Sequence, residues 1–307
     1  MKNLWTELYR PKTVGDYVFT DDTTKKQVEQ WIVERNIPHL LLYGPAGTGK
    51  TTLAKILINE LEIHDYDVMQ VNASRDNGVD FIKTKIEGFI STMPFGELKI
   101  VLLDEADYLS PNAQGLLRGL IEEYQSQARF ILTCNLAHKI IPPLKSRCYE
   151  LHIDKTDQTE FTARAATVLV NESIEFDLET LDTYVKVTYP DLRKCLNLLQ
   201  SNSNTGKLLN PKENDAGTTD YKFALVDLIK ARKLRDARKL LCSQVRPDEM
   251  EELFRWCYDN LQLWSASDEG QDEAILVIRK ALVNHSLVAD PEINISAMIV
   301  ELSQIEK

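Results

Sequence analysis

A short glycine-rich segment carries the strongest structural signal in this chain. Residues 44–51 read Gly-Pro-Ala-Gly-Thr-Gly-Lys-Thr, a G-x-x-x-x-G-K-T pattern. An apolar run at residues 39–43 reads as a buried strand before it, and an apolar helix at residues 53–58 follows. Glycines let consecutive backbone N–H groups curl around phosphate oxygens, and the N-terminus of the next helix attracts the anion. The flanking strand and helix argue against a chance match, so the sequence predicts a loop that binds nucleotide phosphates.

Individual residues of this loop have separate tasks. Lys50 supplies a positive charge for the β- and γ-phosphates of the nucleotide. The hydroxyl group of Thr51 can complete the octahedral shell of a Mg²⁺ ion. The residues expected to contact the nucleotide are Gly47, Thr48, Gly49, Lys50, Thr51 and Thr52.

A second apolar run ends in acidic residues. Residues 100–103 are apolar and lead directly into Asp104 and Glu105. We expect Asp104 to hold Mg²⁺ through water and Glu105 to polarise the attacking water as a general base. Asp107 is left open between a role in this site and a structural one, as a solvated or helix-capping acid. Without Lys50 upstream, the segment would read only as a strand that ends in a charged turn.

A third predicted strand, residues 128–134, is followed by the amide side chain of Asn135. In a doubly wound parallel sheet, ligands bind at the carboxyl ends of the strands. Asn135 is therefore expected near the γ-phosphate beside Asp104, where it could orient water or sense the phosphate. Taken alone, an Asn that ends a strand is usually a turn residue.

Two further segments complete a series of motifs. Residues 141–148 read Ile-Pro-Pro-Leu-Lys-Ser-Arg-Cys, and residues 5–11 read Trp-Thr-Glu-Leu-Tyr-Arg-Pro. With the glycine-rich loop and the Asp-Glu pair, they belong to six motifs that occur in order over residues 4 to about 200. In these motifs the chain resembles the AAA+ ATPases of sliding-clamp loaders. It is similar to the small subunits of replication factor C and, more closely, to the ATPase subunit of T4-type phage clamp loaders.

The resemblance implies an α/β fold, a RecA-like AAA+ domain with a parallel sheet flanked by helices, over residues 1–152. A helical lid at residues 153–203, a linker at residues 204–220 and an all-α collar domain for oligomerisation at residues 221–307 would follow. The sequence pattern agrees, because apolar residues recur at helical spacing in the lid and in the collar, whereas polar, glycine-containing sequence separates them.

The resemblance also implies roles that the residues alone do not. Arg147 would act in trans as an arginine finger on ATP bound by a neighbouring subunit, so the chain would be active only in an oligomer. Arg193 lies in a segment that resembles the sensor-2 helix of the lid and would touch the ATP of its own chain. Without the family, Arg193 reads as an exposed arginine on an amphipathic helix. The segment that would close over the adenine contributes Glu7, Tyr9, Arg10 and Val18.

Composition agrees with this outline. The chain has 307 residues, of which 43% are hydrophobic, and this is enough for two or three folded units with cores. It has no run of about 18 apolar residues, and its first residues lack the apolar core of a signal peptide. We therefore expect a soluble, cytoplasmic protein with no membrane partner, in the host cytosol if a phage encodes it. Five scattered cysteines without a Cys-x-x-Cys pair suggest neither a zinc site nor a disulfide framework.

The net charge of −11 argues at first against a nucleic-acid partner. A loader, however, holds DNA inside a ring of subunits, so only one inner face of each subunit has to be basic. Two segments could supply this basic face. Residues 71–83 read as a strand, a turn and the start of a helix. Residues 110–118 read as a helix with Ser110 as cap and Pro111 at its first position. Both would contact phosphates rather than base edges, and capped surface helices with solvated basic residues are the alternative. The candidates for DNA contact or coupling are Arg75, Asn77, Lys83, Asn112, Gln114 and Arg118, and the resemblance places the last two on a helix that couples DNA binding to the ATP site.

A predicted helix end and the loop after it, at residues 86–95, carry several large apolar side chains. In relatives the corresponding helix end plugs a pocket on the sliding clamp. Large apolar groups left in water mark interaction sites, whereas packing against the parent sheet is the alternative. The candidate clamp contacts are Ile86, Phe89, Ile90, Met93 and Phe95.

These expectations combine into one interpretation. The chain would be an ATPase subunit of a clamp loader, with ATP and Mg²⁺ as cofactors, in a five-membered ring with other copies of itself and a non-ATPase subunit. ATP binding would open the sliding clamp and bind primer-template DNA, and hydrolysis would release the closed clamp on DNA. The alternatives are a branch-migration motor or helicase loader, and a scaffold subunit that binds ATP but hydrolyses it poorly. A helicase of the Asp-Glu-Ala-Asp type is disfavoured because the pattern is not repeated after residue 150.

Overall fold

The computed structural model of the chain describes residues 4–75, 78–203, 206–209, 221–231, 233–245, 250–285, 287–288 and 290–305. Asn77 and most of the predicted linker lie outside the described residues. The chain divides into two compact units. The first comprises Met1–Glu160 and Pro190–Arg193, and the second comprises Phe161–Tyr189 and Lys194–Lys307.

The first unit is built on a sheet of five parallel strands. These are β1 (Leu40–Tyr43), β2 (Val68–Asn72), β3 (Lys99–Asp104), β4 (Ala128–Cys134) and β5 (Tyr149–His152), in the order β2-β3-β4-β1-β5. Strand β4 lies between β1 and β3, with Thr133 beside Leu42 of β1 and Leu132 beside Leu103 of β3. The residues that follow these three strands therefore meet at one edge of the sheet.

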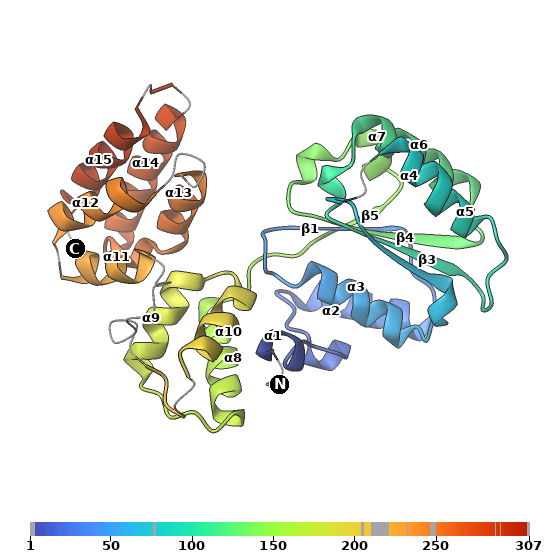
Figure 1. Cartoon of the computed structure of the whole chain (residues 1–307), viewed down its shortest axis with the longest axis horizontal. Coiled ribbons are helices and arrows are strands. Elements are labelled where there is room, and N and C mark those ends of the chain that lie inside the picture. The colour runs from blue at the N-terminus through green and yellow to red at the C-terminus, as the bar shows by residue number, and fades with distance from the viewer. Residues whose placement is uncertain are drawn as a thin grey trace. The chain divides into compact units, whose positions relative to one another are not determined.

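Helices cover both faces of this sheet (Figure 1). Successive strand residues point to opposite faces, so Leu40 and Leu42 pack with one set of helices and Leu41 packs with the other. On one face lie α2 (Asp22–Val33) and α3 (Lys50–Glu60). On the other lie α4 (Val79–Phe81), a π-helical stretch (Ile82–Ile86), α5 (Glu87–Ile90), α6 (Pro111–Glu123) and α7 (Pro142–Lys145). Shorter elements are α1 (Trp5–Leu8) and 3₁₀ turns at Val14–Asp16, Asp65–Asp67, Ala106–Tyr108 and Ala137–Lys139. The predicted parallel sheet flanked by helices is confirmed.

The first turn of α6 shows why this helix begins where it does. The hydroxyl group of Ser110 accepts a hydrogen bond from the backbone N–H of Ala113, at 3.3 Å. Pro111 occupies the first helical position, where a missing N–H leaves no hydrogen bond unmade. The predicted cap is confirmed.

The second unit is helical. Tyr184 packs edge-on against Phe223, with ring centroids 5.1 Å apart, and the indole N–H of Trp256 donates to the carbonyl of Lys186, at 3.0 Å. The predicted lid helices and the predicted collar helices therefore contact one another. None of the helices described in either unit has the length and apolar character needed to cross a membrane. The helices of this unit are α8 (Gln158–Asn171) from Phe161 on, α9 (Leu178–Thr188), α10 (Leu192–Ser201) from Lys194 on, α11 (Tyr221–Lys230), α12 (Leu234–Gln244), α13 (Met250–Asp259), a 3₁₀ turn (Leu261–Leu263), α14 (Asp268–His285) and α15 (Pro291–Leu302).

Residues 206–209, part of the segment predicted as a linker, pack against the lid helices. Leu208 is buried, and its backbone N–H donates to the carbonyl of Glu175, at 2.8 Å. The hydroxyl group of Tyr184 donates to the carbonyl of Leu209, at 2.9 Å. These four residues are thus part of the second unit.

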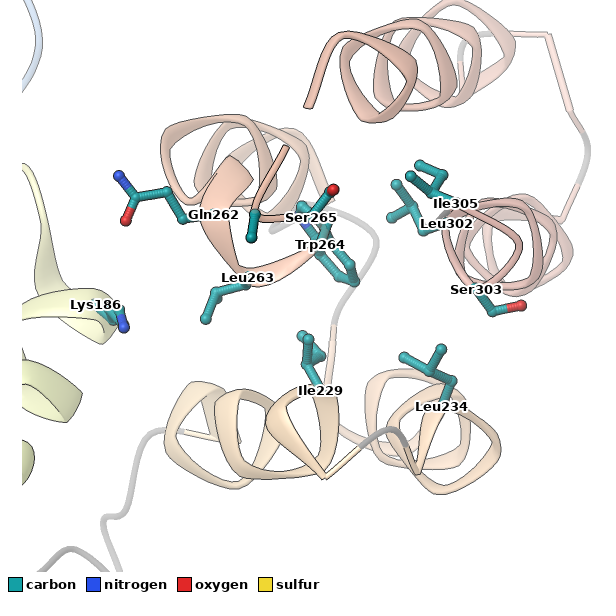
Figure 2. A pocket seen from close by; sticks show the side chains of 11 residues that line it. Lys186, Ile229, Leu234, Gln262, Leu263, Trp264, Ser265, Leu302, Ser303 and Ile305 are labelled. Carbon is teal, nitrogen blue, oxygen red and sulfur yellow. The ribbon is translucent and has the colours of Figure 1, made fainter. Parts of the chain in front are cut away.

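The second unit also contains a cavity of about 250 Å³ (Figure 2). Trp264 is among its lining residues, and its indole N–H donates to the carbonyl of Cys257, at 3.2 Å. The lining also includes the apolar residues Ile229, Leu234, Leu302 and Ile305. No candidate nucleotide-binding residue lines this cavity.

Candidate nucleotide-binding site

The glycine-rich loop connects β1 to α3 and folds back over its own lysine. Gly47 and Gly49 have φ angles of +78° and +93°, a left-handed conformation that glycine adopts at little cost. The ammonium group of Lys50 is buried and donates to the carbonyl oxygens of Gly44 and Pro45, at 2.9 and 2.6 Å. The loop is therefore folded around the cation that is expected to meet the phosphates.

Charged groups from separate parts of the first unit surround this lysine. Burial lowers the pKa of Lys50, and the carboxylates of Asp104 and Asp107 oppose that effect. The guanidinium group of Arg193 lowers the pKa further, so this exposed arginine lies near the loop of its own chain. Residues Pro190–Arg193 belong to the same compact unit as the loop. Two cations from distant sequence positions thus approach the site expected to bind phosphate.

A side chain at Gly47 would collide with the segment that leads into α10. A Cβ atom built there would lie 2.5 Å from Oδ1 and 2.9 Å from Cα of Asp191. Gly47→Ala is therefore expected to weaken ATP binding about tenfold or more, because the left-handed conformation and the displaced backbone cost about 1–3 kcal/mol. Calorimetric titration with ATP measures the effect. Gly88→Ala is the control, since its Cβ would meet nothing within 4 Å. Equal ATP affinity of the two variants would contradict this role for Gly47.

Three elements meet at the carboxylate of Asp104, the last residue of β3. The hydroxyl group of Thr51, in the first turn of α3, donates to Oδ1 of Asp104 at 2.7 Å. The hydroxyl group of Thr133, in β4, donates to the same oxygen. The structure thus brings together the loop and the acidic strand end, as the sequence predicts. The sequence gives no signal for Thr133, which lies inside an apolar strand.

Glu105 and Asn135 follow the ends of β3 and β4. Glu105 is half-buried and has a φ angle of +58°, which is uncommon for a residue other than glycine. Asn135 is exposed immediately after β4. Asp107 is buried, and its Oδ2 accepts the backbone N–H of Leu136 at 3.2 Å. A solvated acid is therefore wrong for Asp107, whose other oxygen, Oδ1, is buried with no hydrogen-bond partner among the described residues, and a role in the site stays a prediction.

The amino-terminal segment is attached to the first turn of α3. Nε of Arg10 donates to the hydroxyl group of Thr52 at 3.2 Å, and the same guanidinium group pairs with Glu7 at 3.4 Å. Tyr9, the neighbour of Arg10, is half-buried. The segment predicted to cover the adenine is therefore tied to the loop through Arg10.

Tyr17 is a residue of this site that sequence reasoning missed. Its hydroxyl group donates to the carbonyl of Thr48 at 3.4 Å, and its ring would lie 3.2 Å from a Cβ atom at Gly49. The adjacent Val18, which was the predicted adenine contact, is half-buried. An aromatic residue beside a predicted adenine contact is the one signal that could have identified Tyr17.

Arg147 lies in the turn after α7. Its guanidinium group forms an ion pair with Glu122, close to the end of α6. Nη1 also donates to the carbonyl of Pro143 at 2.8 Å and to the hydroxyl group of Ser146 at 3.1 Å. The side chain is 34% exposed, so the guanidinium group is accessible at the surface.

The residues expected to contact DNA differ in exposure. Arg75, Lys83 and Asn112 are exposed, whereas Arg118 is half-buried. Nε of Arg118 is buried and has no hydrogen-bond partner among the described residues. Asn77 lies outside the described residues.

Gln114 is buried, so direct contact with DNA is wrong for this residue. Its amide nitrogen donates to the carbonyls of Leu109 and Lys139, at 3.0 and 3.1 Å, and its amide oxygen accepts the N–H of Ile141 at 2.8 Å. These bonds link α6 to the turn that precedes α7. Only the coupling role in the prediction is compatible with this position.

Two of the candidate clamp contacts are also corrected. Ile86 and Ile90 are fully buried in the core between the sheet and its helices, so they are not available to a partner. Packing against the parent sheet, the alternative left open for this segment, applies to both residues. Phe89 is half-buried, and Nζ of Lys99 lies 4.6 Å from the centre of its ring.

The loop after α5 presents the remaining clamp candidates. Met93 and Phe95 are 88% and 76% exposed. The ring of Phe95 packs with His64 and Tyr66, at centroid distances of 5.6 and 5.5 Å. The buried carboxylate of Asp67 fixes the loop by accepting the N–H of Phe95 at 2.9 Å. Tyr66, which is also exposed, enlarges this apolar surface beyond the segment identified from the sequence.

Comparisons with known proteins agree with this fold and site. A model of the ATPase family associated with various cellular activities (AAA) matches residues 40–155. The replication factor C small subunit of Sulfurisphaera tokodaii is 35% identical over 237 residues, which cover 76% of this chain and 69% of the relative. That of Picrophilus torridus is 35% identical over 249 residues, which cover 78% of each. A solved structure of RuvB from Thermotoga maritima, a Holliday junction branch migration motor, matches with a TM-score of 0.56 and 17% identity, over 80% of this chain and 88% of that chain.

The sheet, the loop and the acidic strand end define an AAA-type ATPase. The chain belongs to the family of replication factor C small subunits. It is therefore a clamp-loader ATPase, an enzyme that hydrolyses ATP. The likeness to RuvB shows the fold alone. These comparisons do not test the closer resemblance to a phage subunit, which stays a prediction.

Proposed function

We propose that this subunit uses ATP binding to open a sliding clamp and to hold primer-template DNA, and uses hydrolysis to release the closed clamp on DNA. One observation carries the proposal. The phosphate-loop residue Thr51 bonds directly to Asp104 beside the buried Lys50, in a chain of the replication factor C family. These contacts support an ATP site where the loop meets the end of β3.

The residues present fit ATP and Mg²⁺. The glycines with positive φ angles leave a concave backbone surface without side chains, where phosphate can bind. Lys50 can replace its hydrogen bonds to two loop carbonyls with hydrogen bonds to phosphate oxygens. Thr51 and Asp104 offer oxygen ligands of the kind that Mg²⁺ prefers. When bound there, Mg²⁺ would supply positive charge against the negative charge of the phosphates.

Each remaining residue of the site has a proposed task during hydrolysis. Glu105 takes a proton from the attacking water, and Asn135 orients that water. Arg193 contacts the phosphates, which is supported by its effect on the pKa of Lys50. Arg10 and its neighbours close over the adenine, with the contact to Thr52 as support.

Arg147 is proposed to act on ATP bound by the neighbouring subunit. A guanidinium group there would stabilise charge on the γ-phosphoryl group as the bond to it breaks. The partners would be further copies of this chain and a non-ATPase subunit in a five-membered ring. Arg147 would have to leave Glu122 to reach the neighbour's ATP.

DNA is proposed to bind through phosphates, because primer junctions vary in sequence while backbone geometry does not. The exposed residues Arg75, Lys83 and Asn112 are the proposed contacts, together with the half-buried Arg118. Gln114 lies in α6, and its amide group forms hydrogen bonds with Leu109, Lys139 and Ile141. It would therefore transmit a shift of α6 to the turn before α7. DNA binding and the position of the arginine finger would be coupled in this way.

The clamp is proposed to bind the surface formed by Met93, Phe95 and Tyr66. Burying one large apolar side chain contributes about 1.5–3 kcal/mol, so the double variant Met93→Ser, Phe95→Ser is expected to weaken clamp binding tenfold or more. Its ATPase rate without clamp and its melting temperature should stay unchanged, because both side chains are largely exposed. Clamp titration measures the effect, with Val33→Ser, also exposed, as the control. If the unchanged protein, the double variant and Val33→Ser all bound the clamp with equal affinity, this surface would be ruled out as the clamp-binding site.

A branch-migration motor of the AAA type is the alternative that the sequence leaves open. The two functions differ in what ATP accomplishes. A loader should leave a labelled sliding clamp on primer-template DNA blocked at both ends, and only with ATP. Strand movement at a four-way junction without any retained clamp would favour the motor instead.

A further inference from the structure

We propose that Thr133 is a positioning residue for ATP hydrolysis, which fixes the orientation of both Asp104 and Glu105. The inference rests on the proposed function, because it takes Asp104 as the metal-binding carboxylate and Glu105 as the general base. Nothing in the G-x-x-x-x-G-K-T loop or in the Asp-Glu pair points to Thr133. Its significance comes from the strand order.

The hydroxyl group of Thr133 has one available arrangement of hydrogen bonds. The residue is 2% exposed, so water does not compete for its hydroxyl group. That group accepts the backbone N–H of Glu105 at 3.2 Å and donates its single hydrogen to Oδ1 of Asp104. Since an N–H can only donate and a carboxylate can only accept, the direction of both bonds is determined. The hydroxyl group is therefore hydrogen-bonded to both acidic residues at once.

The first consequence concerns Asp104. Its Oδ1 receives two hydroxyl groups, from Thr51 on the loop side and from Thr133 on the strand side. Because β4 lies between β1 and β3, Thr133 approaches this oxygen from the middle of the sheet. Hydrogen bonds from two directions hold the carboxylate in one orientation, whereas a bond from Thr51 alone would leave it free to turn.

The second consequence concerns Glu105. Its φ angle of +58° is an unfavourable conformation for a residue with a side chain, and such residues persist only where the surroundings impose them. The bond from its N–H to Thr133 is one such constraint. The backbone conformation sets the direction in which the carboxyl group of Glu105 leaves the strand end. Thr133 thereby determines where the proposed base lies relative to the attacking water.

Thr133→Val tests this inference, because valine preserves the shape and removes the hydroxyl group. We expect the maximal ATPase rate to fall about 10²-fold, the loss that displacement of a catalytic group by about 1 Å can cause. Binding of a fluorescent ATP analogue at saturating Mg²⁺ should be nearly unchanged, because Lys50 and the loop remain. The Mg²⁺ concentration needed for half-maximal analogue binding should rise. Thr133→Ser restores the hydroxyl group and should recover most of the rate.

Thr188→Val is the matched control. Thr188 is also buried, and its hydroxyl group donates at 2.8 Å to a backbone carbonyl of its own helix, that of Tyr184 in α9, rather than to a carboxylate. If Thr133→Val lowered the melting temperature, the analogue affinity and the rate together, the role would be structural and the inference would be wrong. An unchanged rate and unchanged Mg²⁺ requirement in Thr133→Val would overturn it equally.

Glu105→Gln separates this inference from the function on which it rests. A slow Glu105→Gln variant beside a fully active Thr133→Val variant would refute the role of Thr133 alone. Full activity of Glu105→Gln would refute the proposed base and, with it, the positioning of that base by Thr133. Loss of rate in both variants, with analogue binding retained, is the predicted result.

Discussion

Replacing Arg147 with alanine is expected to lower ATP turnover of the assembled clamp loader about 10³-fold, while ATP binding stays intact. A guanidinium group supplied by a neighbour neutralises charge on the γ-phosphoryl group only as the transition state forms, so its loss affects the rate far more than affinity. The broken pair with Glu122 should have little effect on stability, because exposed ion pairs contribute about 0–1 kcal/mol. Steady-state turnover and equilibrium ATP binding measure the two effects separately.

Arg35→Ala is the control for this variant, because its guanidinium group also forms an exposed ion pair, with Glu62. Mixing two inactive proteins gives a sharper result. Lys50→Ala cannot hold ATP but still carries Arg147, and Arg147→Ala has an intact ATP site. If Arg147 acts in trans, complexes assembled from both chains should regain part of the turnover. Mixed complexes as slow as either variant alone would show that Arg147 serves its own subunit or none.

Glu105→Gln is the second change with a large expected effect. The amide cannot accept a proton, so we expect turnover to fall about 10²- to 10⁴-fold, the range attributed to general base catalysis. ATP binding should persist, since Lys50, Thr51 and Asp104 remain in place. A complex of this variant should therefore bind clamp and primer-template DNA with ATP but release them slowly.

Single-turnover hydrolysis and the lifetime of the complex with clamp and DNA measure the consequences of Glu105→Gln. Glu62→Gln provides the control, because Glu62 is an exposed acidic residue whose ion pair lies outside the site. A Glu105→Gln variant that hydrolyses ATP at the normal rate would assign the base to another residue. Loss of ATP binding in this variant would instead give Glu105 a role in nucleotide affinity.

The sequence predicts the site well where neighbouring residues determine its geometry. The segment at residues 44–51 needs glycine at fixed positions, and its last two residues, Lys50 and Thr51, begin the next helix. The approach of Asp104 to Thr51 is predictable as well, because Asp104 ends one buried parallel strand, Thr51 follows another, and the carboxyl ends of these strands share one edge.

Residues that act through distant contacts could not be predicted in the same way. Thr133 lies in an apolar strand, and its importance arises only because β4 separates β1 from β3. Gln114 reads as a polar residue on an amphipathic helix, yet the turn before α7 folds over its side chain. The fold had to be known before either environment became visible.

The apolar segment at residues 86–95 shows a different limit. Hydrophobic side chains look alike in a sequence whether they face the sheet or the solvent. A π-helical stretch at Ile82–Ile86 also changes the helical spacing just before this segment, so the two faces cannot be assigned by counting residues. The structure separates buried Ile86 and Ile90 from exposed Met93 and Phe95.

The most direct test of the proposed function is the steady-state ATPase rate of the assembled complex, measured with sliding clamp and primer-template DNA added separately and together. We predict that the two together raise the rate well above either alone, and that Arg147→Ala abolishes the increase. A rate that responds to DNA but is indifferent to the clamp would contradict the loader and favour another AAA-type DNA remodeller.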